Sequence, residues 1–454
     1  MPLRDVSSPQ ETEFFGEIEQ SFLQEAQGLA RADYLFNLEA SSYKKIEESW
    51  KNFQAHLKSN KKIYGTHTHF GAQISRECKT SHAEHQKELI RYLQVGVGSF
   101  FKEGVVRRAL RLQVKKMALG LSGVSPQTMA ALIAYSNSQE IAPVPQDGSL
   151  GASGDLIPMA HALGPLFEQI EPGARDALAL VNTNSMVVSH AIDLFLESRK
   201  LILNSLSITV KILLATQTSQ EMLTLFEIDE IKEQRPRCAQ VALWMKKQIH
   251  GRQESETKPQ EAQGQPRYSL RCSPLVFGLA LDLLEEVQKK IELEYRSLAD
   301  NPVITQEAIY HGGLFYTVYL ASASDQLMEA IARVAEMLDR QVLLLMDPEL
   351  SSGLSYNLEY PGLSHCKGIH QLISSLYQRL RSFGVPSWQM SFSAESNNQD
   401  IVPASMQAWN RIQDMLGSFR SLVKAADFCA TRALAIRGGQ IPASLESWSQ
   451  SQSH

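Results

Sequence analysis

The segment DQLMEAIARVAEMLDRQVLLL, residues 325–345, decides the fold class. Its apolar residues recur at intervals of three and four, which places them on one face of a helix, while Glu329 and Arg333 fall on other faces. A second segment, residues 276–291, has the same spacing. The two apolar stripes are Leu327, Ile331, Val334, Leu338, Val342 and Leu345, and Val276, Ala280, Leu283, Val287 and Ile291. The spacing predicts long amphipathic helices.

Further helical patterns cover residues 186–226 and 371–383, and period-two alternation is scarce. We therefore expect an all-α protein whose centre is a bundle of long helices. We expect an N-terminal domain over residues 1–190, which holds a loop rich in glycine and proline, and a long-helix bundle domain over residues 191–454.

Composition excludes several classes of protein. The chain has 454 residues, of which 43% are hydrophobic and 20% charged, and its net charge is −5. Because nucleic-acid binding usually needs a basic surplus, no nucleic-acid partner is expected. The five cysteines are widely spaced and form no Cys-x-x-Cys pair, which indicates reduced thiols. With no membrane span and no secretory signal in the pattern, a cytoplasmic location is expected.

The loop GSLGASGDLIP, residues 148–158, followed by Ala160-His161, is the most specific motif. Read alone, Ala-Ser-Gly is an ordinary turn with a serine helix cap. With its flanks, it resembles the family of ammonia-lyases and aminomutases that includes histidine, phenylalanine and tyrosine ammonia-lyases. The resemblance implies that Ala152, Ser153 and Gly154 cyclise into a methylidene-imidazolone by loss of two waters, with no external cofactor. Small residues let the backbone bend, and Ser153 supplies the leaving hydroxyl.

Two further motifs follow the same resemblance. YGTHTHFG, residues 64–71, is similar to the family's tyrosine loop, which implies that Tyr64 is the catalytic base. A phenol has a pKa near 10, so this role requires a positive or hydrogen-bonding environment. QPRYSLRCSP, residues 265–274, implies that Arg271 grips the substrate carboxylate and that the catalytic Tyr268 and the substrate-binding Gln265 line the site.

Single residues and short segments elsewhere in the chain also match the family. Asn182 follows an apolar pair and is implied to bind the substrate or the ring oxygen, and Phe315 follows the Gly312-Gly313 pair. The turn Asp300-Asn301-Pro302 is interpreted as structural. The segment SAESNNQD, residues 393–400, resembles the aromatic branch, in which Glu395 would hold the substrate amine. Asn398 and Gln399 would tune the site.

The substrate is expected to be an aromatic L-amino acid, with tyrosine slightly ahead of phenylalanine. Histidine enzymes carry a glutamate at the position of Gln399 and a histidine at that of Leu93, whereas Tyr92-Leu93 resembles the aromatic pairs. The Tyr92 hydroxyl can bond a phenol, and its ring can pack on phenylalanine. Elimination gives an α,β-unsaturated acid and ammonia, and a 2,3-aminomutase that makes a β-amino acid would use the same residues.

Several residues depart from the family pattern: His67, His69, Thr183, Asn184, Pro266, Leu314 and Tyr316. We expect these changes to crowd the site and to indicate a specialised enzyme with an unusual aromatic-like substrate. The resemblance is firm over residues 63–400, and relatives continue with further helices where this chain stops.

Two other functions stay open. His67, His69, His82 and His85 have His-x-His and His-x-x-His spacings that could bind zinc, although solvated histidines are commoner. The second open possibility is a non-catalytic homologue. The site residues that the chain retains argue against it. The resemblance also implies a helical homotetramer with active sites built from several subunits, acting on a small-molecule amino acid.

Overall fold

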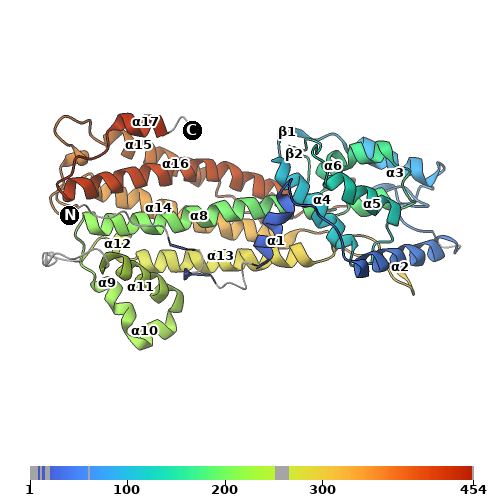
Figure 1. The fold of residues 1–454 in the computed structure, drawn as a ribbon, viewed down its shortest axis with the longest axis horizontal. Coiled ribbons are helices and arrows are strands. Elements are labelled where there is room, and N and C mark those ends of the chain that lie inside the picture. The colour runs from blue at the N-terminus through green and yellow to red at the C-terminus, as the bar shows by residue number, and fades with distance from the viewer. Residues whose placement is uncertain (1–8, 11–12, 16–20, 60–61, 251–264, 452–454) are drawn as a thin grey trace.

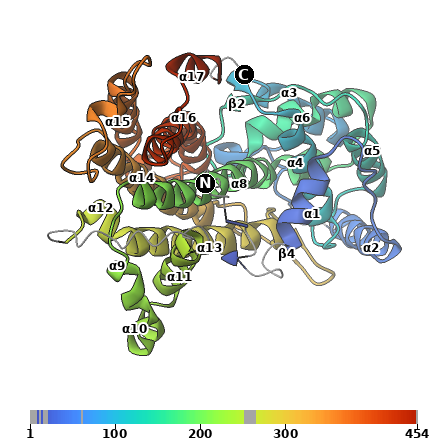
Figure 2. The same ribbon diagram turned by 60° about the vertical axis from the view of Figure 1, so that its left-hand side comes forward.

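The computed structural model describes residues 9–10, 13–15, 21–59, 62–250 and 265–451. Figure 1 shows an elongated molecule in which a bundle of long helices lies at one end and the N-terminal helices gather at the other. Figure 2 shows the same two parts from another side. The all-α expectation is confirmed: the described strands are short and form two-stranded pairs, β1 (Val97–Phe100) with β2 (Pro145–Asp147) and β3 (Val303–Ile304) with β4 (Ile309–Tyr310).

Four long helices form the bundle: α8 (Ser185–Ala215), α13 (Ser273–Arg296), α14 (Val318–Leu345) and α16 (Ser405–Arg437). The predicted stripe on α14 is confirmed, because its six apolar residues are completely buried. On α13, Ala280, Val287 and Ile291 are buried, and Val276 and Leu283 are partly buried against the same core. Burial of these faces against one another is what aligns the helices.

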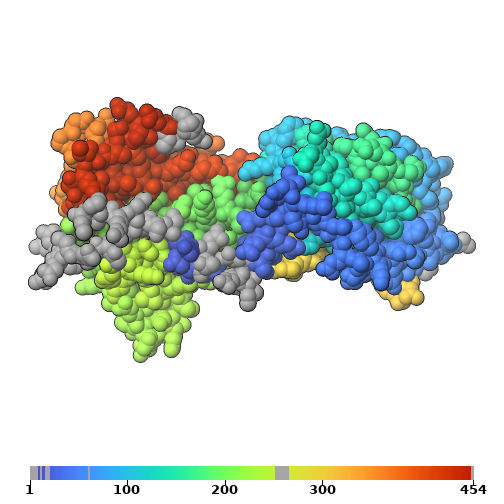
Figure 3. Space-filling model, in the orientation of Figure 1, coloured from blue at the N-terminus to red at the C-terminus, as the bar shows by residue number. Residues whose placement is uncertain are grey.

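The helix predicted over residues 186–226 is shorter than expected. α8 ends at Ala215, and Gln217 has a positive φ of 51°, which breaks the helical path. The apolar residues beyond this point belong to α9 (Glu221–Thr224) and the short 3-10 helix η4 (Leu225–Glu227). With α10 (Asp229–Gln234) and α11 (Pro236–His250), they form the arm that projects below the bundle in Figure 3.

The remaining bundle elements lie at its edges. α15 runs over Lys367–Ser382, which agrees with the helix predicted over residues 371–383, and α12 (Tyr268–Arg271) precedes α13. The short 3-10 helices η5 (Tyr356–Leu358) and η6 (Ser387–Met390) and the last helix, α17 (Leu445–Ser451), follow in the C-terminal half, whereas the 3-10 helix η3 (Gly71–Gln73) lies in the N-terminal part. Among the helices that the structure describes, none combines the length and the apolar character needed to cross a bilayer.

In the part of the chain that the structure describes, seven α-helices precede the bundle: α1 (Ser21–Ala30), α2 (Ala40–Leu57), α3 (His82–Leu93), α4 (Glu103–Met117), α5 (Pro126–Ser136), α6 (Leu156–Gln169) and α7 (Asp176–Val181). The predicted domain boundary at residue 190 lies inside α8, which packs against both α4 and the bundle helices.

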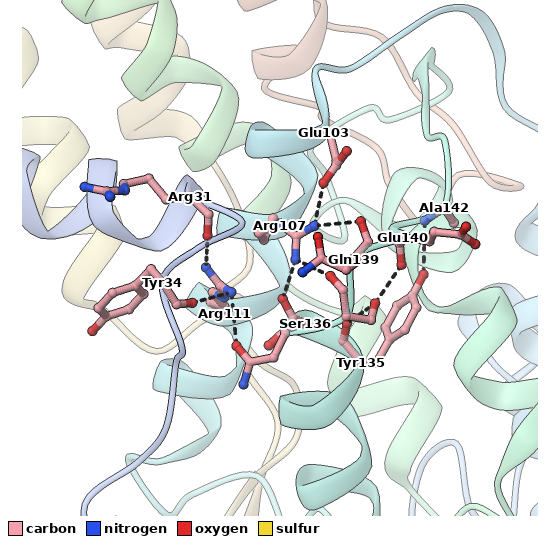
Figure 4. Close-up of polar contacts among 12 residues, drawn as sticks. Arg31, Tyr34, Glu103, Arg107, Arg111, Tyr135, Ser136, Gln139, Glu140 and Ala142 are labelled. Atoms are coloured by element: carbon pink, nitrogen blue, oxygen red, sulfur yellow. Dashed lines mark hydrogen bonds and ion pairs between the residues drawn. The ribbon is translucent and has the colours of Figure 1, made fainter.

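Buried arginines on α4 tie these helices together, as Figure 4 shows. The Arg111 guanidinium donates to the carbonyls of Leu29, Arg31 and Tyr34 at 2.8–3.0 Å and to Asn137 Oδ1 at 3.0 Å. These acceptors lie at or just beyond the C-terminal ends of α1 and α5, where helix carbonyls lack intrahelical partners. Burial lowers the pKa of Arg111 to about 10, so the side chain stays charged at neutral pH.

Removing this guanidinium should therefore destabilise the N-terminal part. We expect Arg111→Ala to lower the free energy of unfolding by about 3 kcal/mol or more, because several buried acceptors lose their donors. Urea unfolding of both proteins measures the change. Arg333→Ala is the matched control, since Arg333 is exposed and pairs only with Glu329 one turn away on α14, and should cost less than about 0.5 kcal/mol. Equal losses in the two variants would contradict the assignment.

Candidate active site

A cavity of about 920 Å³ lies where the N-terminal part meets the bundle. Its walls come from the tyrosine loop, α3, the glycine-rich loop before α6, and two loops that follow residues 310 and 393. Eleven of the fourteen predicted site residues line it: Tyr64, Tyr92, Leu93, Ala152, Ser153, Gly154, Asn182, Phe315, Glu395, Asn398 and Gln399. Segments more than 300 residues apart thus share one site.

The Ala-Ser-Gly loop is pressed against the turn that precedes α8. Gly154 has a φ of +74°, and a Cβ at this position would overlap the backbone carbonyl of Thr183. The Asp155 N–H donates to that carbonyl at 2.6 Å. The sharp bend at Gly154 therefore depends on a residue without a side chain.

Both faces of the loop are held by hydroxyl groups. On one side, Thr317 Oγ1 donates to the Gly151 carbonyl at 3.0 Å and lies 2.5 Å from Ser405 Oγ. On the other, Ser149 Oγ donates to Asp155 Oδ1 at 3.0 Å. Because Thr317 directly precedes α14 and Ser405 begins α16, the bundle itself fixes the position of the loop.

Asp155 is the buried anchor of this loop. Its Oδ2 accepts the Val187 N–H at 2.8 Å from the first turn of α8. Burial raises the pKa of the Asp155 carboxyl to about 7, although hydrogen bonds from Val187 and Ser149 and the charge of Lys116 act in the opposite direction. Burial therefore favours the neutral form of this carboxyl far more than it is favoured in a solvated aspartate.

Lys116 lies beneath the same turn and is also completely buried. Its ammonium donates to Asn184 Oδ1 at 2.8 Å and to the carbonyls of Glu294 and Ser297 at 2.6 and 2.8 Å. Burial lowers the pKa of Lys116, and the Glu294 carboxylate partly restores it. Asn184, one of the departures from the family pattern, thus belongs to a buried polar network and lines no part of the cavity.

Ser153 is held from two directions. Asn182 Nδ2 donates to its carbonyl at 2.8 Å, and Gln399 Nε2 donates to its hydroxyl oxygen at 2.8 Å. The Asn182 Oδ1 atom is buried and has no hydrogen-bond partner. An unpaired buried acceptor is costly, and among the described residues Asn182 is one of the few side chains with such an atom.

Tyr64 faces the same cavity. Its hydroxyl oxygen accepts the Gly71 N–H at 2.8 Å, and the His311 ring packs edge-on against the phenol, with centroids 6.1 Å apart. Burial raises the pKa of Tyr64, and the Glu395 charge raises it further, whereas the Gly71 hydrogen bond and Arg175 lower it. The hydrogen-bonding environment expected for this tyrosine is present, but the net effect disfavours its anion.

One wall of the cavity is apolar. Leu89, Tyr92 and Leu93 lie on one face of α3, opposite Leu156 and Ile157 at the start of α6. About half of the Tyr92 surface is exposed, and burial of its phenol raises the pKa of Tyr92 above the ordinary value. Flat apolar surfaces with a few polar groups suit an aromatic ligand.

Three predicted residues, Gln265, Tyr268 and Arg271, lie away from this cavity. The Arg271 guanidinium sits 4.6 Å from the Tyr268 ring centroid and bonds Gln265. Gln341 Nε2 donates to the Ser269 carbonyl at 2.8 Å, which places α12 beside the far end of α14, whereas Thr317 at the near end holds the cavity loop. Gln341 follows Thr317 by 24 positions, which corresponds to about 36 Å of helix. One chain therefore cannot bring Arg271 to Ser153.

The cavity also contains residues that the sequence reasoning missed. His311 lies four residues before the predicted Phe315, and Asp400 follows Gln399. Tyr316, in contrast, was among the departures expected to crowd the site, and it does line the cavity. Leu89 could have been found, because it lies three residues before Tyr92 on a helix. Asn301 lines the cavity too, although its turn was interpreted as structural; the neighbouring Asp300 does have that role, since it forms a fully buried ion pair with Arg175 at 2.7 Å.

The expected crowding by His67, His69 and Leu314 is wrong, since none of the three lines the cavity. His67 Nδ1 accepts the Ile63 N–H at 3.0 Å, and the His69 ring packs edge-on against His85. Leu314 is about half exposed. Within the described residues, no group of three or more His, Cys, Asp or Glu side chains is arranged to hold a metal ion.

The raised pKa of Asp155 predicts a pH-dependent stability. Its folded pKa of about 7 exceeds the ordinary value of 3.8, so the native state binds more protons between these pH values and loses stability as the pH rises. Asp155→Asn removes this effect. As the pH rises from 4 to 7, the free energy of unfolding of this variant should therefore increase by about 2–4 kcal/mol relative to that of the original protein.

Urea unfolding at a series of pH values measures the difference. Asp229→Asn, at an exposed position on α10, is the control and should keep the original pH dependence. If the Asp155→Asn curve runs parallel to that of the original protein, Asp155 does not titrate in this range.

The chain matches the family model described as aromatic amino acid lyase over residues 23–167 and 166–452. It is 30% identical over 412 residues to a histidine ammonia-lyase of Geobacillus thermodenitrificans, which covers 84% of this chain and 81% of that protein. A probable histidine ammonia-lyase of Thermoplasma volcanium is 29% identical over 395 residues, covering 80% of this chain and 78% of that protein.

Solved structures share the fold. A tyrosine aminomutase from Streptomyces globisporus has a TM-score of 0.80 at 24% identity and covers 92% of this chain and 87% of its own. A Pantoea agglomerans phenylalanine aminomutase has a TM-score of 0.81 at 23% identity, and the match covers 92% of this chain and 89% of that one. The expectation of a carbon–nitrogen lyase is confirmed, and the chain belongs to the family of aromatic amino acid lyases.

Proposed function

We propose that this protein is an ammonia-lyase that eliminates ammonia from an aromatic L-amino acid, with tyrosine ahead of phenylalanine. The observation that carries the proposal is that Tyr64 and the Ala152-Ser153-Gly154 loop, far apart in the sequence, face one cavity with an apolar wall. A proton acceptor and a precursor of an electrophile are thereby brought to the same substrate.

The residues present fit a methylidene-imidazolone at this loop. Gly154 lies where any Cβ would overlap the Thr183 backbone. Ala152 is small and buried, and Asn182 donates a hydrogen bond to the Ser153 carbonyl. Ala152, Ser153 and Gly154 would form the group, and Asn182 would hold its ring oxygen. Such a group supplies an electrophilic carbon that draws electrons from the substrate.

The side chains of this chain account for the other requirements of the elimination. Tyr64 Oη accepts the proton from the substrate β-carbon, and the Gly71 N–H stabilises the phenolate that must form first. The apolar residues of α3 and α6 hold the ring of the substrate and exclude water. The products are an α,β-unsaturated acid and ammonia.

The substrate carboxylate needs a cation, and none of the residues lining the cavity is a lysine or an arginine. The charged residues of the lining are acidic, Glu395 and Asp400. Since α12, which carries Arg271, is bonded to α14 at Gln341, about 36 Å along the helix from Thr317, we propose that Arg271, Tyr268 and Gln265 of one chain complete the cavity of another. This arrangement requires a homo-oligomer, as in the expected tetramer.

Histidine is the second candidate substrate, because the relatives named above at 29–30% identity are called histidine ammonia-lyases. Gln399 and Leu93 favour an aromatic hydrocarbon or phenol over imidazole. An aminomutase outcome uses the same residues, and it differs only in whether ammonia adds back at the β-carbon.

Peptide mass analysis tests the electrophile directly. We expect the peptide containing residues 152–154 to weigh two waters less than its sequence, and Gly154→Ala to show the unmodified mass, because its Cβ would overlap Thr183. Gly417→Ala is the matched control: a Cβ there has open space, so modification should be retained. An unmodified peptide from the original protein would contradict the proposal.

The same proteins are then given tyrosine, phenylalanine and histidine, and the unsaturated acids are detected by ultraviolet absorbance, with chromatography for β-amino acids. The modified proteins should release an arylacrylate fastest from tyrosine, and Gly154→Ala should release none. Faster turnover of histidine would assign the second candidate substrate, and a β-amino acid as the main product would assign an aminomutase.

Complementation tests the shared site. Tyr64→Phe and Arg271→Ala should each be nearly inactive alone, but chains mixed during refolding or co-expression should recover activity in up to about a quarter of sites. In those sites Tyr64 and Arg271 come from different chains. Mixing Tyr64→Phe with the Tyr64→Phe/Arg271→Ala double variant is the control and should recover nothing. Absence of recovery in the first mixture would exclude a shared site.

A further inference from the structure

Two loops that are 323 residues apart meet at the carboxylate of Glu395. Its Oε1 accepts the Ala72 N–H at 2.8 Å, at the start of the short helix η3 that ends the tyrosine loop. Its Oε2 accepts Asn398 Nδ2 at 2.6 Å. Both carboxylate oxygens thus accept a hydrogen bond from the protein itself, in addition to the expected role of Glu395 in holding the substrate amine.

Gly71 makes room for this contact. It has a φ of +56°, and a Cβ here would overlap the Glu395 carboxylate. The Gly71 N–H is the group that donates to Tyr64 Oη at 2.8 Å. Adjacent amides of one turn, those of Gly71 and Ala72, therefore bind the phenol and Glu395, so a shift of the turn breaks both bonds together.

The loop that carries Glu395 is itself held in an unusual conformation. Glu395, Ser396 and Asn397 have φ values of 49°, 54° and 64°, a left-handed region that L-residues rarely adopt. Ala394 and Gln399 close the loop through paired backbone hydrogen bonds of 2.8 and 3.2 Å. Strained backbone of this kind persists where the surroundings require it, often at functional sites.

Gln399, at the other end of this loop, donates to Ser153 Oγ at 2.8 Å. The loop of residues 394–399 therefore contacts the tyrosine turn through Glu395 and the Ala-Ser-Gly loop through Gln399. From this geometry we infer that Glu395 is a positioning residue for Tyr64, which holds the Gly71 N–H against the phenol through Ala72. The inference rests on the proposed function, in which Tyr64 is the base.

Glu395 acts on Tyr64 in two opposite ways. The hydrogen bond from Gly71 that it supports lowers the pKa of Tyr64, whereas its own negative charge raises that pKa. The other groups that act on Tyr64 are Arg175, whose charge lowers its pKa, the Tyr92 phenol and the His311 ring. Because an amide oxygen can accept from Ala72 without a charge, two substitutions separate the effects.

Titration of Tyr64 in Glu395→Gln and Glu395→Ala tests the inference. Tyrosinate absorbance is recorded against pH, and the same variant carrying Tyr64→Phe is subtracted to isolate Tyr64. Glu395→Gln keeps the acceptor and loses the charge, so Tyr64 should titrate at lower pH than in the original protein. Glu395→Ala loses both, so Tyr64 should titrate at higher pH than in Glu395→Gln.

Kinetics supply the second readout. Glu395→Gln should keep most of kcat and move its acidic limb to lower pH, and Glu395→Ala should lose roughly tenfold in kcat. Glu77→Gln is the matched control, because Glu77 lies in the same region, pairs with Lys62 and bonds no amide of the turn. It should leave the Tyr64 titration unchanged.

Two results would overturn the inference. Equal Tyr64 titration in Glu395→Gln and Glu395→Ala would show that only the charge matters. A large rise in KM for Glu395→Gln with no change in the titration would assign the carboxylate to the substrate amine. Because the titration needs no turnover, it reports on Glu395 even if the peptide mass shows that no prosthetic group forms.

Discussion

The close approach of Gly154 to the Thr183 backbone is the constraint on which the rest of the site depends. It bends the loop so that Ser153 faces the cavity and Asp155 turns inward to Val187. Burying an ionisable carboxyl beneath that bend is costly, and the hydrogen bonds that hold Asp155 offset part of the cost. The loop is consequently fixed by the start of α8, and its geometry follows that of the bundle.

The long helices determine distances that loops alone could not hold. α14 and α16 begin at the cavity, with Thr317 and Ser405 against Gly151, and extend away from it as rigid rods. Residues at the far ends of α14 and α16 are therefore held at a fixed distance from the cavity. This explains why a motif as specific as that around Arg271 lies outside the cavity of its own chain.

Much of the fold could be predicted from the sequence, because stripes such as that from Leu327 to Leu345 encode the buried face directly. Eleven of the fourteen residues predicted from motifs line one cavity, because the chemistry behind those motifs requires particular side chains at fixed spacings. The early end of α8 was missed because Met222, Leu223, Leu225 and Phe226 continue the apolar pattern, although the polar residues 216–221 separate them from α8 and they pack in α9 and η4. His311 and the contact of Glu395 with Ala72 were missed because they depend on tertiary juxtaposition, which spacing does not encode.

The length of α14 has a consequence for how such a protein behaves in dilute solution. If a cavity at one end is completed only by the far end of another copy, a dissociated chain has no working site at all. The rate of catalysis then depends on the substrate concentration, through substrate binding, and also on the protein concentration, through association of the chains. Surface residues on the bundle, remote from any reacting atom, would control activity through the association constant.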